Sequence, residues 1–148
     1  MGHRICTIAV TGLLAIAPAF VQAQNRVPVY VASSSAESDD VGRQLVVDIK
    51  EAIRGSDAFR LVEDRKQSPY LKYIVTTQGV STVSTAAGWL VAYDNLAIPM
   101  GGAYIYSGVI TCRRDRISIC ARTALANLDV ALQELERGAP ELWKTLLK

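Results

Sequence analysis

The chain has 148 residues, with 16 Lys or Arg, 14 Asp or Glu and a single His. Half of the residues are hydrophobic, which is enough for the core of one domain and argues against disorder. The formal charge of +2 leaves no basic footprint for general nucleic-acid binding, and no run of 18 apolar residues follows the N-terminal segment, which argues against a membrane-spanning body.

Residues 1–23 have the features of a secretory signal peptide. Arg4 supplies a positive start, an apolar stretch follows, and small side chains stand at the end, which predicts cleavage between Ala23 and Gln24. The alternative is an uncleaved anchor. We therefore expect a periplasmic bacterial protein whose mature chain is one domain, 24–148, with no membrane span after cleavage.

The first half of that domain predicts a strand, a helix and a second strand. The first strand is expected over 27–32, where Val alternates with other residues. Apolar residues then recur at spacings of three and four over 41–53, which indicates an amphipathic helix that Ser38 or Asp39 can cap. The second strand is expected over 59–62.

Three further strands are expected in the second half. The segments 70–83, 89–93 and 103–112 are rich in Thr, Val, Ile and Tyr, and residues typical of turns separate them. Sequential strands that are joined by short turns pair antiparallel.

Two helical segments close the chain. A helix is expected from about residue 118, with an apolar stripe over 121–135 and with Gly138 and Pro140 at its end, and a short helix is expected over 141–147. The order β-α-β-β-β-β-α predicts an α+β (α/β) fold. We expect a mixed, mostly antiparallel sheet of about five strands with two main helices on one face.

Cys112 and Cys120 are an even pair in a chain expected to be exported, so we expect them to form a disulfide bond. The bond would join the end of the last strand to the first turn of the helix that follows it. A redox-active pair is the alternative, but C-x-x-C spacing is absent, and a metal site would need two more ligands.

The composition excludes much of enzyme chemistry. The only histidine, His3, lies in the predicted signal peptide, so the mature chain has no Ser-His-Asp or Cys-His nucleophile system. A phosphate-binding loop motif is also absent. We therefore predict no enzyme, no cofactor and no metal. A hydrolase that uses carboxylates alone remains as an alternative. Its candidate carboxylates, which are read more simply as helix caps and solvated turn charges, are Glu37, Asp39, Asp40, Glu63 and Asp64.

Four arginines lie within ten residues of one another. They are Arg113, Arg114, Arg116 and Arg122, with only Asp115 to offset them locally. Three of them lie inside the predicted disulfide loop, which would hold them as a fixed array for a carboxylate, a phosphate or an acidic partner. The alternative is a solvated loop whose charges aid solubility.

The aromatic residues of the later strands form a second group of candidate binding residues. On the last strand, Tyr104 and Tyr106 are expected on one face and Ile105 and Val109 on the other, since side chains alternate along a strand. Two helices cover only one face of a sheet. If they cover the Ile105 face, the Tyr face would be open to a partner, and Trp89 on a neighbouring strand is a third candidate binding residue. Alternatively, these aromatic residues fill the core.

Between 29 and 62 the chain resembles the amino-terminal domain of TolB. The features that carry the resemblance are Asp-Val-Gly at 40–42, which leads a helix, Arg-Gly-Ser at 54–56 and Phe-Arg-Leu-Val at 59–62. The chain also resembles uncharacterised exported proteobacterial proteins in which one Cys ends the last strand and another opens the last helix. The resemblance implies an α/β domain that works through protein contacts without catalysis.

These observations favour a periplasmic, non-catalytic interaction or accessory protein of the envelope, with an unidentified protein partner. The alternative is a small-ligand or envelope-glycan binding protein that uses the Arg cluster and the aromatic face. The apolar turn 96–100 is a further candidate contact site.

Overall fold

The computed structural model describes residues 26–96 and 102–147. The predicted signal peptide, its cleavage site and most of the apolar turn 96–100 lie outside the described residues. In chain order the elements are β1 (Val27–Ser35), α1 (Asp40–Arg54), β2 (Phe59–Val62), the 3-10 turn η2 (Arg65–Gln67), β3 (Tyr70–Ser81), β4 (Ser84–Asp94), β5 (Gly102–Arg113), the 3-10 turn η3 (Arg114–Arg116), α2 (Ile117–Gly138) and α3 (Pro140–Leu146).

The five strands form one mixed sheet in the order β2-β1-β3-β4-β5. β1 runs parallel to both β2 and β3, because α1 crosses over between β1 and β2 and returns the chain in the same direction. β3, β4 and β5 pair antiparallel through short connections. The predicted α+β class and order are confirmed.

One predicted boundary is wrong. The sequence suggests a break at 86–88, but β4 runs without interruption from Ser84 to Asp94, and the turn that reverses the chain lies before it at Thr82 and Val83. Gly88 keeps its place in β4 because it is paired on both sides, with Thr76 of β3 and Val109 of β5. Pairing with two neighbours outweighs the low strand preference of a single glycine.

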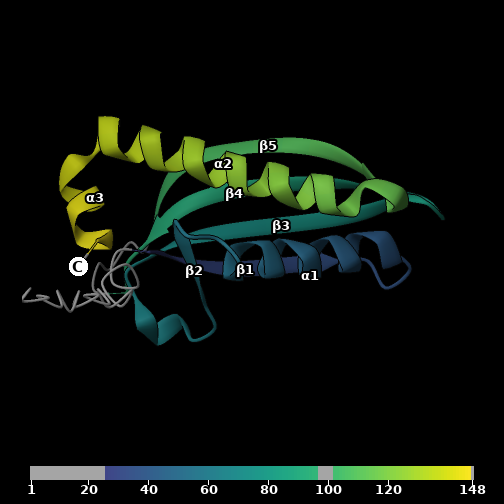
Figure 1. Ribbon diagram of the computed structural model, residues 1–148, viewed down its shortest axis with the longest axis horizontal. Coiled ribbons are helices and arrows are strands. Elements are labelled where there is room, and N and C mark those ends of the chain that lie inside the picture. The colour runs from purple at the N-terminus through teal and green to yellow at the C-terminus, as the bar shows by residue number, and fades with distance from the viewer. Residues whose placement is uncertain (1–25, 97–101, 148) are drawn as a thin grey trace, which may run out of the picture.

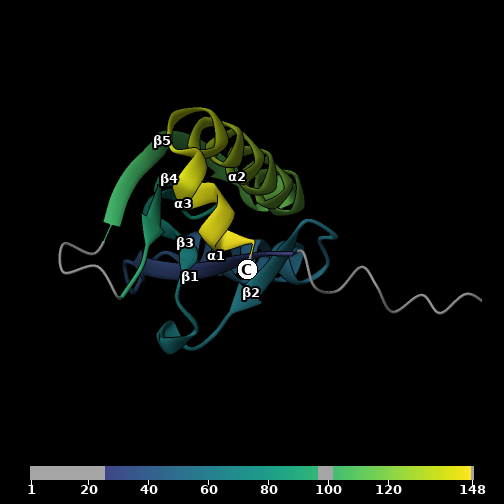
Figure 2. The ribbon, with the colours of Figure 1, turned by 90° about the vertical axis from the view of Figure 1, so that its left-hand side faces the viewer.

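Both long helices cover the same face of the sheet, and α1 and α2 pack against each other (Figure 1). Figure 2 views the molecule from one end. In it the sheet extends from β1 to β5 along one side of α2, and α3 follows α2 at the C-terminal end of that helix. In the described part of the chain, no helix covers the central strands on the opposite face. We call that surface the open face.

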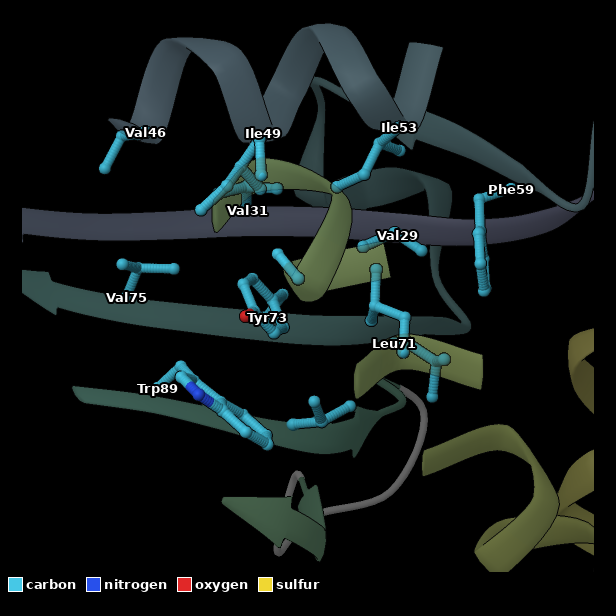
Figure 3. Close-up of a cluster of buried hydrophobic side chains, with 14 of the residues drawn as sticks. Val29, Val31, Val46, Ile49, Ile53, Phe59, Leu71, Tyr73, Val75 and Trp89 are labelled. Atoms are coloured by element: carbon cyan, nitrogen blue, oxygen red, sulfur yellow. The ribbon is translucent and has the colours of Figure 1, made fainter. Parts of the chain in front are cut away.

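The core lies between the sheet and the helices. α1 buries one stripe of residues spaced by three and four, and the strands supply every second residue (Figure 3). Core side chains that Figure 3 labels are Val29 and Val31 of β1, Val46, Ile49 and Ile53 of α1, Phe59 of β2, Leu71, Tyr73 and Val75 of β3, and Trp89 of β4.

The C-terminal helix α3 docks on the same core. Leu146 is buried, Leu142 and Trp143 are half-buried against the core, and the Thr145 hydroxyl lies 3.0 Å from that of Tyr93 in β4. The short terminal helix that the sequence predicts is therefore present and packed. Over the described ranges, no helix is long and apolar enough to cross a membrane.

Candidate functional site

The disulfide between Cys112 and Cys120 is present, as the sequence predicts. Cys112 is buried at the end of β5 and Cys120 is buried in the first turn of α2. The bond joins the edge strand of the sheet directly to the helix that lies beside it. The two elements are therefore held together at one end by a covalent bond as well as by packing.

Two of the four arginines line one open hollow between β5 and α2. This hollow, which we call the Arg hollow, has a volume of about 470 Å³. Arg113 and Arg116 line it, and the Nε atom of Arg113 lies 3.2 Å from Oδ1 of Asp115. The other residues that line it are Ile110, Thr111, Ile119, Cys120 and Thr123. Because the Arg113–Asp115 pair is exposed, it holds Arg113 only weakly.

The other two arginines point elsewhere, so the predicted array is divided. Arg114 donates from Nη2 to the carbonyl oxygen of Thr82 at 3.0 Å, and it lines a different hollow together with Asp40 and Gln44 of α1. Arg122 is exposed on α2 and does not line the Arg hollow. The 3-10 turn between β5 and α2 separates Arg114 from Arg116, because successive side chains in it point about 120° apart.

The predicted placement of the tyrosines on β5 is wrong. A β-bulge interrupts the pairing of β4 with β5: Ala92 pairs with Tyr104, but Val91 pairs with Tyr106, which leaves Ile105 as an extra residue. An inserted residue shifts the alternation by one position. Tyr104 therefore lies on the open face and Tyr106 on the helix-covered face, where the sequence placed both on the same face.

On the helix-covered face, Trp89 and two tyrosines consequently pack ring against ring, with Tyr73 and Trp89 buried and Tyr106 36% exposed at the edge of the sheet. Trp89 is only 9% exposed, and its ring centroid lies 6.0 Å from that of Tyr73 and 5.2 Å from that of Tyr106. Tyr104 is 63% exposed, and its hydroxyl lies 3.0 Å from that of Ser107. Of the three aromatic candidates, only Tyr104 reaches the open face.

Gly108 explains how the Trp89 ring fits beneath β5. A Cβ atom at this position would lie 2.5 Å from Cζ2 of Trp89, which is far inside van der Waals contact. Because glycine has no side chain, the indole can pack directly against the backbone of β5 here. The sequence contains no pattern that pairs these two residues, because the contact depends on the register between β4 and β5.

The open face consists of small, apolar and hydroxyl-bearing side chains in register across four strands. Val109 is the most exposed of the large hydrophobic residues, at 80%. One row across β1, β3, β4 and β5 is Ala32, Ile74, Leu90 and Ser107, and the next is Ser34, Thr76, Gly88 and Val109.

A buried polar cluster lies beneath the N-terminus of α1. Asp39 is only 2% exposed, and its Oδ1 accepts a hydrogen bond from the backbone N–H of Gly42 at 2.8 Å. Its Oδ2 accepts one from the hydroxyl of Thr85 in β4 at 2.6 Å. Burial by itself would raise the pKa of Asp39, but hydrogen bonds, chiefly those from Thr85 and Gly42, outweigh burial and hold that pKa below its ordinary value.

The same cluster requires glycine at position 42. A Cβ atom there would lie 2.2 Å from Oδ2 of Asp39 and 2.2 Å from Oγ1 of Thr77. The Thr77 hydroxyl in turn donates to that of Ser35 at 2.8 Å. Of the carboxylates that the sequence offers for hydrolysis, Asp39 is thus engaged as a helix cap, one of the two caps predicted. No group of three or more metal-ligating side chains occurs within the residues that the structure describes.

The matches to known proteins are found among solved structures. No protein-family model matches it, and no curated protein matches it. Among solved structures it is similar to a PelC dodecamer from Paraburkholderia phytofirmans. The identity is 15% and the TM-score is 0.42, over 76% of this chain and 89% of that one. The functional argument therefore depends on the residues of this chain.

Proposed function

We propose that this chain is an exported protein of the bacterial envelope that acts by binding another protein, not by catalysis. The observation that carries the proposal is the open face. It spans four strands about 4.8 Å apart and several rows of residues, which amounts to about 400 Å². A contiguous, partly apolar patch of about that size is the largest that monomers usually expose, and such patches are often functional.

The charges around the open face favour a protein surface over a nucleic acid or an anionic membrane. In the row Tyr30, Lys72, Ala92 and Tyr104, the one charged residue is Lys72. Its Nζ atom lies 3.8 Å from Oδ2 of the buried Asp94, so the positive charge is partly balanced. Small and hydroxyl-bearing side chains let another backbone approach closely, as packed sheets require.

The disulfide supports export, because such bonds persist in oxidising compartments. The test is fractionation of cells that express the full chain. We expect periplasmic material that begins at Gln24 and carries an intact Cys112–Cys120 bond. Retention in the cytoplasm, with both thiols free, would overturn this part of the proposal.

Binding at the open face is tested by placing a photoreactive amino acid at Thr76, an exposed residue in the middle of that face. A matched control carries the same group at Glu136, an exposed residue of α2. We expect a specific heterologous adduct after irradiation of whole cells from position 76 and none from position 136. Equal adducts from both positions, or none from position 76, would refute the assignment of this face.

The Arg hollow favours a second candidate function, the binding of a small anion such as an acidic sugar. Arg113 and Arg116 line a hollow of about 470 Å³, which is within the usual range for ligand sites. Calorimetric titration with galacturonate and with inorganic phosphate tests it. We expect the double change Arg113→Ser and Arg116→Ser to weaken binding at least about ten-fold. The change Arg122→Ser is the matched control and should leave binding unaltered.

A further inference from the structure

β5 is a long and unprotected edge strand. It stands at the end of the strand order, and among the described residues no strand pairs with its outer side. Its 12 residues extend over about 40 Å. The opposite edge strand, β2, has only 4 residues and so offers little backbone for pairing. The sheet therefore has one edge that suits the addition of another strand.

Natural edge strands usually carry features that prevent such pairing, such as Lys, Pro or charges that point inward. Residues 102–112 contain no charged residue and no proline. The bulge at Ile105 lies near the start of β5, so the stretch from Tyr106 to Arg113 pairs regularly with β4. The outward backbone groups of this stretch are thus presented in a regular row.

The helix layer adds an apolar stripe beside this edge. Ile119 and Thr123 of α2 line the Arg hollow next to β5, and Glu134 lines a second hollow beside the start of β5, with a volume of about 290 Å³. Val130 lies on the same stripe, four residues before Glu134. Ile119 is 49% exposed and Val130 is 37% exposed, so the stripe presents apolar surface to solvent.

Charged residues lie at both ends of this edge, with arginines at one end and a glutamate at the other. The end of β5 and the start of α2 carry Arg113 and Arg116, whereas the other end of the edge carries Glu134. Glu134 pairs with Arg137 at 2.8 Å on the surface, and an exposed pair of this kind exchanges partners at little cost. A two-fold axis perpendicular to the sheet would reverse the edge and so bring Arg113 and Arg116 of one copy beside Glu134 of the other.

We propose that a second copy of this chain pairs with this edge, β5 antiparallel to β5, to form one continuous ten-stranded sheet with both α2 helices on the same side. The edge is about 40 Å long and about 20 Å deep, one strand layer plus one helix, which gives about 800 Å² per copy. That area is the standard size of a stable interface. The disulfide holds β5 and α2 as one unit before pairing, which lowers the entropic cost of association. This inference goes beyond the proposed function, which uses the face of the sheet and not its edge.

The first measurement is the mass of the exported, oxidised chain by light scattering and sedimentation. We expect a dimer with a Kd below about 10 µM. A wild-type chain that stays monomeric at about 100 µM would overturn the proposal and would leave this edge to a different partner.

The second measurement uses Val109, which lies near the middle of β5 and hence near the two-fold axis. Because it is 80% exposed, a charge there is compatible with the fold, which circular dichroism verifies. We expect Val109→Lys and Val109→Glu each to raise the dimer Kd at least about ten-fold by like-charge repulsion. An equimolar mixture of the two variants should recover a heterodimer, seen by native mass spectrometry.

The matched control is Ile74→Lys, a charge on the open face two strands away from the edge. It should leave the dimer intact. If it dissociates the dimer, the copies pair face to face and edge pairing is wrong. Failure of the Lys and Glu mixture to form a heterodimer would equally refute edge pairing.

Discussion

Replacement of Asp39 is the most informative single test of what stabilises this fold. It connects the first turn of α1 to β4 through two hydrogen bonds, from the N–H of Gly42 and from the hydroxyl of Thr85. Asp39→Ala removes both bonds at once. The Thr85 hydroxyl retains the carbonyl oxygen of Gln78 at 3.1 Å as an acceptor, so it is not left without a partner.

The expected loss follows from these two bonds. Removal of an N-cap side chain costs about 1 kcal/mol. A hydrogen bond from a buried hydroxyl to a carboxylate contributes about 2 kcal/mol. We therefore expect Asp39→Ala to lower the free energy of unfolding by about 3 kcal/mol. Asp39→Asn keeps the shape and the bond from Gly42, and should cost about 1–2 kcal/mol.

Acid should also remove the stabilisation that the ionised side chain of Asp39 provides. The pKa of Asp39 in the folded chain lies below its ordinary value of 3.8, which applies to the unfolded chain. The carboxylate therefore stabilises the fold fully above pH 3.8, and this stabilisation is lost as the pH falls through the lower, folded pKa. Asp39→Asn should accordingly lose less stability on acidification than the wild type.

Urea unfolding, followed by the fluorescence of Trp89 and Trp143, measures these differences. Asp40→Ala is the matched control: Asp40 is exposed, adjacent in sequence and paired with Arg43 on the surface, so its loss should cost less than about 0.5 kcal/mol. A cost below about 1 kcal/mol for Asp39→Ala, or a cost equal to that of Asp40→Ala, would refute the reasoning.

Three further predictions concern other parts of the fold. Gly42→Ala should lower the free energy of unfolding by about 2 kcal/mol, because the new methyl group would collide with buried oxygens. Gly138→Ala is the control: its methyl group meets open space, so it should be neutral or stabilising. A comparison of the urea midpoints of the two variants tests this prediction. Replacement of Cys112 and Cys120 by Ser should cost about 2–3 kcal/mol, and dithiothreitol should reduce the stability of the wild type to the same level. Burial raises the pKa of Tyr73 to about 12, so the fold should lose stability above pH 10, where the unfolded phenol ionises, and Tyr73→Phe should diminish that loss in alkaline unfolding curves.

Local patterns in the sequence are enough to predict most of the elements. The spacing of apolar residues over 41–53 marks α1, and Asp39 before it is the cap that the structure shows. The pair Cys112 and Cys120 forms the disulfide that its spacing and expected compartment predict. These features depend on residues within one or two helical turns of each other, so local sequence contains the necessary information.

The candidate site depends on tertiary structure for a different reason. Strand alternation predicts one face for Tyr104 and Tyr106, but the bulge at Ile105 separates them, and a bulge arises only when two strands pair in a particular register. The need for glycine at position 42 likewise follows from Thr77, which is 35 residues away in the chain.

The sequence by itself therefore determined the fold class, two candidate helix caps and the disulfide, because each rests on short-range spacing. Which side chains face solvent, which arginines share a hollow and which strand is left as an open edge were decided only by tertiary structure. Those properties depend on the order and register of the strands, and the sequence of one strand does not specify which strands pair with it or in which register.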